Sequence, residues 1–332
     1  MKAPTERYIA FRKPLPSSDS LSTKTAPRER AIIVWAVEPF LKEKRKVRTL
    51  LAAMDLWRGT TPAEIIPVAV LSPLDLNWPV ELVAPLGDQL YEMAQRSLVP
   101  VLEKIENEPL SEPRILLQSD SSVRLAAETL FKFAKKEKAE IIAVNTRARR
   151  GIGRLGSFAE RLIALSPIPV LAVNPATSIP GRISRVLFPT DYSSKSKKAF
   201  EKVVAWAARW NASITLFHRF DAPIRASFTA QETGLGMNAE LIRRLYDDAR
   251  RDQKKQSEKW LSIAHGAGAP CECVVSESED NVADQILKAA KTCHADLIAM
   301  ATHRGPIAQA ILGSVARDVL VNSHRPVAIL HV

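Results

Sequence analysis

Short apolar runs alternate with longer mixed stretches along most of the chain. Ile32–Trp35 and Val186–Pro189 are apolar at consecutive positions, which is typical of strands buried on both faces of a parallel sheet. The longer stretches between such runs are predicted as helices. The pattern therefore indicates an α/β fold, because neighbouring parallel strands need crossover helices.

An internal repeat sets the organisation of the chain. Residues 139–147 match residues 295–303 position by position, a separation of about 156 residues. After a one-residue slip, Gly156-Ser157 falls on Gly313-Ser314. Both copies therefore end with an apolar strand, a loop of small residues, a Gly-Ser pair that opens a helix, and a last strand.

The predicted elements occur in the same order in both halves. In the first half the strands are Ile32–Ala36, Ile65–Leu71, Arg114–Gln118, Ile141–Asn145 and Val170–Val173, and the helices are Leu41–Trp57, Gly87–Asn107, Val123–Lys136 and Phe158–Leu165. In the second half the strands are Arg185–Thr190, Ser213–His218, Glu272–Val275, Asp296–Ala301 and Val327–Val332, and the helices are Lys195–Asn211, a long helix ending near His265-Gly266, Asn281–Cys293 and Ser314–Asn322.

We therefore expect two tandem doubly wound α/β domains, each with a five-stranded parallel sheet and about four helices. The expected division is a flexible basic arm at 1–29, a degenerate first domain at 30–175, a linker at 176–182 and a second domain at 183–332. Prolines and a glycine mark the linker. A length of 332 residues suits two cores.

Composition narrows the class of protein. The chain is 46% hydrophobic and 25% charged, as in ordinary globular proteins, and its net charge of +11 favours acidic partners without identifying one. No apolar stretch is long enough to span a membrane. The three cysteines Cys271, Cys273 and Cys293 are too few for a disulfide framework or a zinc site, so we expect buried free thiols and a cytoplasmic protein.

Candidate binding residues follow the first strand of the second half. In doubly wound sheets ligands bind beyond the carboxyl ends of the strands, here where the first and fourth strands meet. Thr190, Asp191 and Ser193 lie at the first of these ends. The Asp191 carboxylate suits hydrogen bonds from a ribose or a base, although a helix cap or turn residue is the alternative.

A second candidate loop follows the fourth strand and contains Ala301, Thr302, His303, Arg304 and Gly305. Small residues let backbone N–H groups approach a phosphate, and His303 and Arg304 can supply positive charge. A pair of solvated loop side chains is the alternative interpretation of the two basic residues.

The next candidate is the helix that Gly313 and Ser314 open, with Val315 as its following residue. Its unpaired N–H groups and positive dipole end suit an anion. Plain turn and cap chemistry is the alternative for the Gly-Ser pair.

Four blocks of the second half resemble the universal stress protein family. They are Pro189–Ser193, Ala299–Gly305, Ile311–Ala316 and Arg325–Val327. The resemblance covers nearly all of residues 184–332 and, more weakly, 30–174. It implies an adenine nucleotide alpha hydrolase-like fold and binding of ATP or another adenine nucleotide, with Mg²⁺ only if ATP is bound.

The loop departs from the pattern of the ATP-binding members, which have Gly, two residues, Gly, nine residues, then Gly-Ser or Gly-Thr. With a one-residue deletion after His303, Ala301 takes the place of the first glycine and the second is lost. Gly305 is then the only glycine of this loop. A Cβ at a close phosphate contact restricts the approach that glycine permits.

The first half has lost more of the motif. Val37 stands where the second half has Asp191, with Glu38 displaced by one residue. The loop that follows residue 146 contains four arginines, Arg147, Arg149, Arg150 and Arg154, and two further glycines, Gly151 and Gly153. These residues would suit an anion cradle, but a helper domain that packs against its partner is the simpler interpretation.

These observations favour a non-enzymatic stress-response protein whose second domain binds an adenine nucleotide. A nucleotide-free scaffold and a slow ATP hydrolase are the alternatives, and the absence of a nucleic-acid recognition motif argues against a nucleic-acid-associated protein. We expect Val170–Val173 and Val327–Val332 to pair across an internal pseudo-two-fold axis as an intramolecular pseudo-dimer. A further homo-oligomer and an unidentified protein partner stay open.

Overall fold

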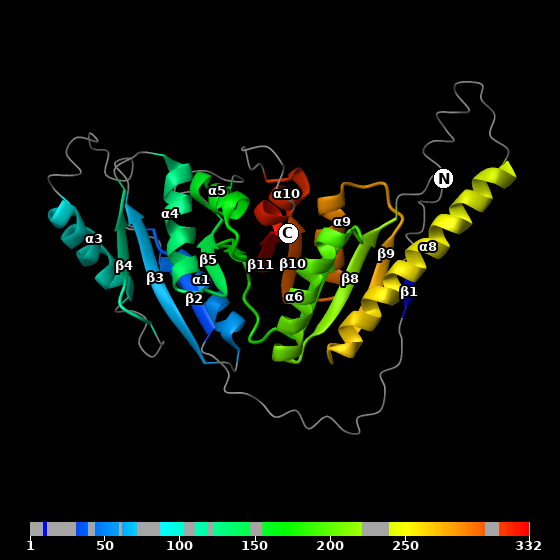
Figure 1. Cartoon of the computed structure of the whole chain (residues 1–332), viewed down its shortest axis with the longest axis horizontal. Coiled ribbons are helices and arrows are strands. Elements are labelled where there is room, and N and C mark those ends of the chain that lie inside the picture. Colours follow the sequence, from blue (N-terminus) through cyan, green and yellow to red (C-terminus); the bar gives the residue numbers. More distant parts are fainter. Residues whose placement is uncertain are drawn as a thin grey trace.

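The chain forms a single twisted sheet covered by helices on both faces (Figure 1). This computed structural model describes residues 9–11, 31–38, 44–59, 62–71, 87–102, 110–118, 122–146, 155–220, 239–302 and 312–331. The strand order is β1-β9-β8-β7-β10-β11-β6-β5-β2-β3-β4. The predicted α/β class is therefore confirmed, with the strands of the two halves merged into one sheet.

The elements of the first half keep the predicted order. They are β2 (Ala31–Ala36), α1 (Lys44–Arg58), β3 (Ala63–Leu71), α3 (Gly87–Leu102), β4 (Arg114–Leu117), α4 (Val123–Lys136), β5 (Ile141–Asn145), α5 (Ser157–Leu165) and β6 (Val170–Val173). The strands pair in parallel in the order β6-β5-β2-β3-β4.

The second half repeats this arrangement. Its elements are β7 (Arg185–Pro189), α6 (Ser194–Trp210), β8 (Ser213–Arg219), α8 (Ala239–Gly266), β9 (Cys271–Ser276), α9 (Val282–Thr292), β10 (Leu297–Thr302), α10 (Ser314–Asn322) and β11 (Val327–His331). The strands pair in parallel in the order β11-β10-β7-β8-β9.

Residues 9–11 of the predicted flexible arm form β1 (Ile9–Phe11), which pairs antiparallel with the outer edge of β9. At these three residues the backbone differs from the solvated arm that the polar composition indicates. The physical reason is the edge of β9, whose N–H and C=O groups offer hydrogen bonds to an added strand.

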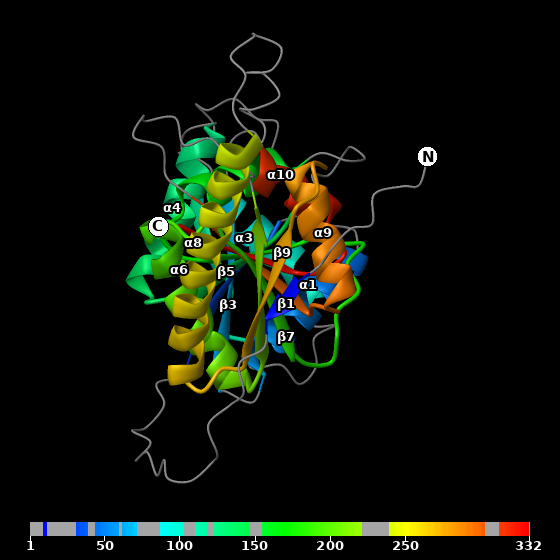
Figure 2. The same ribbon diagram turned by 90° about the vertical axis from the view of Figure 1, so that its right-hand side faces the viewer.

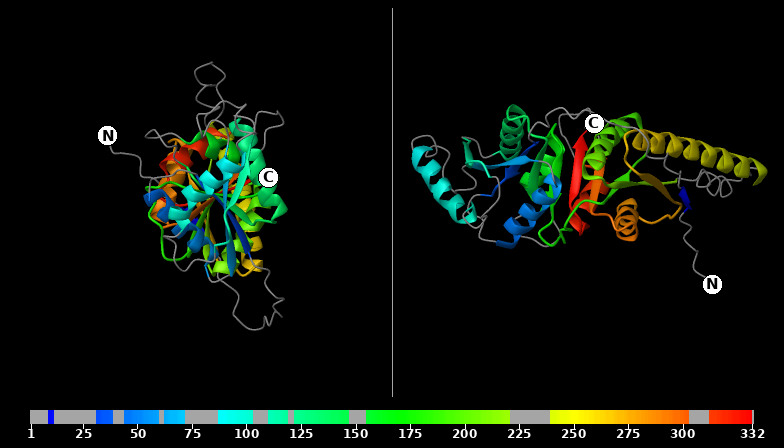
Figure 3. Two further views of the ribbon diagram at one scale, coloured as in Figure 1. Left: turned by 90° about the vertical axis from the view of Figure 1, so that its left-hand side faces the viewer. Right: turned by 90° about the horizontal axis from the view of Figure 1, so that it is seen from below.

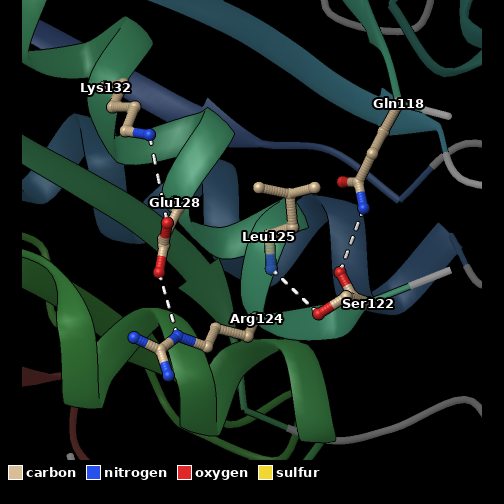
Figure 4. A network of polar contacts seen from close by, with 6 residues as sticks. All are labelled: Gln118, Ser122, Arg124, Leu125, Glu128 and Lys132. Carbon is tan, nitrogen blue, oxygen red and sulfur yellow. Dashed lines mark hydrogen bonds and ion pairs between the residues drawn. The ribbon is translucent and has the colours of Figure 1, made fainter. Parts of the chain in front are cut away.

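Capping residues explain several helix bounds. Ser122 caps α4 by accepting a hydrogen bond from Leu125 N–H at 3.3 Å, and its own carbonyl accepts one from the Gln118 side chain at 3.1 Å (Figure 4). Asn211 ends α6 in the left-handed conformation, with φ 52°, which asparagine tolerates better than most residues.

Each face of the sheet has its own hydrophobic core. One core joins residues of α1, α3, α6 and α8, and the other joins residues of α4, α5, α9 and α10. Figure 2 shows α8 and α9 on opposite sides of the sheet, and the right panel of Figure 3 shows helices on both sides of the twisted sheet along its length. Both cores contain residues of both halves, so packing is continuous across the middle of the molecule.

The halves meet where β6 and β11 pair antiparallel, with Val170 opposite Ile329 and Ala172 opposite Val327. This confirms the predicted pairing of the two terminal strands. Each half would otherwise expose the backbone hydrogen-bonding groups of one edge strand, and the two edge strands bond to each other instead.

Side chains on one face strengthen this junction. Trp57 at the end of α1 packs edge-on against Trp206 and Trp210 of α6, with ring centroids 4.6 and 4.9 Å apart. Arg209 donates two hydrogen bonds of 2.7 Å to the Glu140 carboxylate. Each of these contacts joins the first half to the second.

On the opposite face, α5 and α10 flank the same junction. Glu160 of α5 and Arg317 of α10 form an ion pair. The two residues are equivalent in the repeat, since each is the fourth residue of its helix after a Gly-Ser opening.

Candidate functional site

The carboxyl ends of β7 and β10 form the part of the second half where the sequence predicts a site. The two strands are parallel neighbours, with Leu297 opposite Val186 and Ile298 opposite Leu187. The strand order changes direction between them, since β8 and β9 continue on the side of β7 and β11 on the side of β10. In doubly wound sheets, ligands bind at such a switch point.

Asp191 lies just past β7 and is held by its own turn. Its Oδ1 accepts hydrogen bonds from Ser193 N–H at 3.0 Å and from the Ser196 hydroxyl at 2.6 Å. Partial burial acts to raise the pKa of Asp191, but hydrogen bonds from Ser196 and Ser193 outweigh it and lower the pKa from 3.8 to about 2. The residue is exposed, so a fixed negative charge faces solvent at this edge of the sheet.

Thr190 and Ser193 shape this turn. Thr190 is buried, and its hydroxyl accepts a hydrogen bond from Tyr192 N–H at 3.0 Å. Ser193 is the N-cap of α6 and accepts from Ser196 N–H at 3.1 Å. Both hydroxyls therefore have a structural role in the backbone turn that presents Asp191, which is the turn-and-cap chemistry left open as the alternative.

Tyr192 anchors the turn to the core, a role that the sequence analysis missed. Its φ of 57° is left-handed, and its hydroxyl lies 2.7 Å from Ser257 Oγ of α8 and 3.3 Å from Cys273 Sγ of β9. The ring packs 5.4 Å from Trp260. The contacts span 65 and 81 residues of sequence, so local patterns carry no signal for them.

His218 of β8 also supports the turn. Its Nδ1 lies 2.9 Å from the Thr190 carbonyl, and because a carbonyl only accepts, Nδ1 carries the proton. Its ring lies 4.6 Å from the Tyr192 ring. The backbone on either side of Asp191 is thus fixed from two neighbouring elements.

The second predicted loop begins with Ala301 and Thr302 at the end of β10, and both residues are half-buried. Thr302 Oγ1 lies 2.8 Å from Nδ1 of His331 on β11, and Nε2 of His331 donates to the Ile163 carbonyl of α5. The Thr302 hydroxyl is therefore turned toward the first half of the molecule. His303, Arg304 and Gly305 lie outside the described residues.

Gly313 is the N-cap of α10 and, lacking a side chain, forms no side-chain hydrogen bond to the first turn. Ser314 is exposed and Val315 is half-buried. A Cβ added at Gly313 would meet no described atom within 4 Å. Its φ of −58° is open to any residue, so glycine is not required here by backbone conformation. The first-turn N–H groups of α10 are the natural place for an anion at this edge.

This edge combines a fixed negative charge with backbone hydrogen-bond donors. Asp191 offers a carboxylate for sugar or base donors, and the start of α10 offers N–H donors for phosphate oxygens. Both lie at the carboxyl edge of the same pair of strands. Within the described residues, no group of three or more His, Cys, Asp or Glu side chains could hold a metal ion.

The corresponding edge of the first half differs. The strand register corrects the predicted equivalence. Val37 N–H is bonded to the Val68 carbonyl at 2.9 Å as Thr190 N–H is bonded to the Phe217 carbonyl, so buried Val37 matches Thr190 and Glu38 matches Asp191. The first half therefore keeps a carboxylate, that of Glu38, at the position of Asp191, where the sequence comparison places Val37. The arginine-rich loop predicted as an anion cradle, with Arg147, Arg149, Arg150, Gly151, Gly153 and Arg154, lies outside the described residues.

The cysteines carry no disulfide among the described residues. Cys271 and Cys273 are buried free thiols, as predicted, and Cys293 is half-buried. Burial raises the pKa of all three thiols. Among the described helices, none combines the length and apolar character needed to cross a membrane.

Comparison with known proteins agrees with this architecture. The chain is 27% identical over 148 residues to the universal stress protein MJ0531 of Methanocaldococcus jannaschii, an alignment that covers 44% of this chain and 81% of that protein. A universal stress protein from Archaeoglobus fulgidus has a similar structure, with a TM-score of 0.58 at 17% identity over 90% of this chain and 98% of that one.

A functionally unknown protein from Pseudomonas aeruginosa, PA1789, gives a TM-score of 0.51 at 16% identity, over 91% of this chain and 92% of that one. At this identity the two structural likenesses show the shared fold alone. The model of the universal stress protein family matches two segments, residues 42–174 and 182–331. Since these segments make up most of the sequence and follow one another, the chain belongs to the universal stress protein family and contains two copies of its fold.

Proposed function

We propose that the second half binds an adenine nucleotide, ATP or a related compound, and that the protein acts in a stress response as a nucleotide-dependent regulator rather than as an enzyme. The observation that carries the proposal is the exposed Asp191 carboxylate, fixed by Ser193 and Ser196 at the switch point of the sheet. A carboxylate whose pKa is lowered to about 2 is charged at any physiological pH.

In this proposal each part of the edge has one task. Asp191 accepts hydrogen bonds from the ribose or base, and the start of α10 at Gly313 and Ser314 donates to phosphate. The proposed ligand passes Ala301 and Val315 between these two groups, and Thr190 and Ser193 shape the turn. His303, Arg304 and Gly305 belong to the proposed site from the sequence motif alone. Mg²⁺ would enter only with ATP, held by the phosphates.

Calorimetric titration of the full chain with ATP, ADP and AMP tests this proposal. We expect one nucleotide per chain, and Asp191→Ala should weaken binding about tenfold or more, since hydrogen bonds to a charged group contribute roughly 1.5–3 kcal/mol. Asp55→Ala is the matched control, because that carboxylate is 50% exposed near the end of α1, in the first half. Equal affinity in both variants would place the nucleotide elsewhere.

A nucleotide-free scaffold is the second candidate, and a specific observation favours it. Asp191 Oδ1 already accepts two hydrogen bonds within its own turn, and the Thr302 hydroxyl is engaged by His331. These groups stabilise the fold without any ligand. Wild-type protein that gives no heat at millimolar ATP would support the scaffold and exclude the nucleotide proposal.

The remaining expectations follow from the two-copy organisation. We propose that residues 30–175 and 183–332 are the two domains, joined by a linker at 176–182, and that they form an intramolecular pseudo-dimer. The pairing of β6 with β11 supports that arrangement. A cytoplasmic location is proposed from the cysteine content. The protein partner that would respond to bound nucleotide is unidentified.

A further inference from the structure

The equivalent carboxylates of the two halves are followed by different residues. The strand register matches Glu38 with Asp191, so the residues that follow them, Pro39 and Tyr192, are also equivalent. Tyr192 has a φ of 57°, in the left-handed region. The ring of a proline holds φ at about −65°, so a proline cannot take this conformation. The turn that follows Asp191 is therefore closed to the sequence of the first half.

The left-handed backbone of Tyr192 sets the geometry of the carboxylate before it. Asp191 Oδ1 accepts a hydrogen bond from Ser193 N–H at 3.0 Å, and Tyr192 is the residue between this acceptor and this donor. The same oxygen accepts from the Ser196 hydroxyl at 2.6 Å. A change of φ at Tyr192 would move the Ser193 N–H and the start of α6 relative to the carboxylate. Both bonds thus depend on a conformation that costs free energy for any residue with a Cβ.

A chain of buried hydrogen bonds from α8 holds Tyr192 in this conformation. The Ser257 hydroxyl donates to the Gln253 carbonyl at 3.0 Å, and its oxygen accepts from Gln253 Nε2 at 2.8 Å. The proton of Ser257 is then already used, so the Tyr192 hydroxyl is the donor in the 2.7 Å contact between the two hydroxyl oxygens. Burial raises the pKa of Tyr192 above its usual range, which keeps this donor protonated.

Contacts with three elements fix the rest of the side chain. The Tyr192 ring packs edge-on against Trp260 of α8, with centroids 5.4 Å apart, and its centroid lies 4.6 Å from that of the His218 ring on β8. Cys273 Sγ of β9 lies 3.3 Å from the hydroxyl oxygen. These contacts offset the cost of the left-handed backbone.

We propose that Tyr192 is a positioning residue: its anchored left-handed backbone fixes the Asp191 carboxylate in its binding geometry, and nucleotide binding in the second half depends on it. This role rests on the nucleotide function proposed above. It also separates the two halves, since the residue after Glu38 cannot make this turn. Ser257 is 1% exposed, so it acts on Asp191 only through Tyr192.

The pKa of Asp191 in the ligand-free full chain, measured by NMR of the carboxyl carbon, tests the positioning without any nucleotide. Partial burial acts to raise this pKa, and hydrogen bonds from Ser196 and Ser193 bring it to about 2. Tyr192→Pro copies the residue of the first half and should return the pKa toward 3.8, because the carboxylate loses these donors.

Ser257→Ala leaves the turn itself unchanged, so it tests the anchor even if Tyr192→Pro does not fold. It should shift the pKa of Asp191 in the same direction by a smaller amount. Tyr192→Phe removes the other hydroxyl of the same bond, and the double variant should shift the pKa no further than either single one. Ser262→Ala is the matched control on α8, because that exposed hydroxyl donates to a carbonyl of its own helix, and the pKa should stay at about 2.

Calorimetric titration of the same proteins with ATP tests whether binding depends on Tyr192. Tyr192→Pro should weaken ATP binding about tenfold, the loss expected for one hydrogen bond to a charged group, and Ser262→Ala should bind like the wild type. A shifted Asp191 pKa with unchanged ATP affinity would overturn this dependence. An Asp191 pKa that stays at about 2 in both Tyr192→Pro and Ser257→Ala would overturn the positioning, whether or not ATP binds. Shifted pKa values in a protein whose wild type binds no ATP would support the positioning of Asp191 and refute the nucleotide function instead.

Discussion

The bidentate contact between Arg209 and Glu140 should couple the stabilities of the two halves. Both hydrogen bonds are 2.7 Å long, and the side chains are only 20% and 23% exposed. Glu140 Oε1 also accepts from Trp57 Nε1 at 3.3 Å. Glu140→Gln keeps an acceptor for the tryptophan and removes the charge, while Arg209→Met removes the guanidinium and keeps much of the apolar stem.

The magnitude follows from the geometry. Two unit charges about 4 Å apart attract by about 4 kcal/mol at an effective dielectric constant near 20, and desolvation of the half-buried groups offsets part of this. A charge-assisted bidentate pair should then keep a net coupling of about 1.5–3 kcal/mol. The control is the Arg124–Glu128 pair on α4, which joins neighbouring turns of one helix and has an arginine that is 54% exposed (Figure 4). That pair should couple by about 0.3–0.5 kcal/mol.

The assay is a double-mutant cycle for each pair, with free energies of unfolding from urea titrations followed by circular dichroism. The junction cycle should give a coupling at least threefold larger than the helix control. A junction coupling below about 0.5 kcal/mol, equal to that of the control, would refute the claim that this contact holds the halves together. Because both hydrophobic cores run through the junction, we also expect a single cooperative transition in the wild type.

Two further predictions concern titratable groups of the second half. The pKa of Asp191 is lower in the folded protein than in the unfolded chain, so the stability it contributes is present above about pH 3.8 and is lost as the pH falls toward 2. The difference in unfolding free energy between wild type and Asp191→Asn should therefore vanish near pH 2 in acid titrations. At pH 7 this difference should stay below about 1 kcal/mol, because the carboxylate is exposed. A difference that is constant from pH 7 to 2 would contradict this prediction. Cys271 and Cys273 are buried and the pKa of each thiol is raised, so a thiol reagent at pH 8 should label them only after unfolding. Mass spectrometry locates the labelled residue, and rapid labelling of either cysteine in the native protein would disagree with the structure.

Much of the fold follows from local sequence. The predicted bounds of α4, β5, β6 and α10 agree with the structure residue for residue. In α4 the reason is a serine cap at Ser122 followed by a helix with a buried alanine and leucine face. β5 and β6 are apolar runs, ended by polar residues and by the Asn174-Pro175 turn. Such signals need no long-range information.

The differences arise where distant partners decide. Residues 9–11 lie in a polar segment, and only the edge of β9, more than 250 residues away, gives them a strand to pair with. At the candidate site, the sequence places Asp191 at the end of β7 and Gly313 at the start of α10, as the structure does. The support of that site by Tyr192 and the connection of Thr302 to His331 depend on neighbouring strands and helices, so local patterns could not reveal them.

The ion pair of Glu160 with Arg317 bears on how the protein came to be one chain. A dimer of two identical halves would place the same residue on both sides of its axis, so two glutamates or two arginines would face each other there. Opposite charges at equivalent positions require that the two copies differ in sequence there. The two halves, expressed as separate polypeptides, should accordingly favour pairing with each other over pairing with themselves, as the subunits of a heterodimer do.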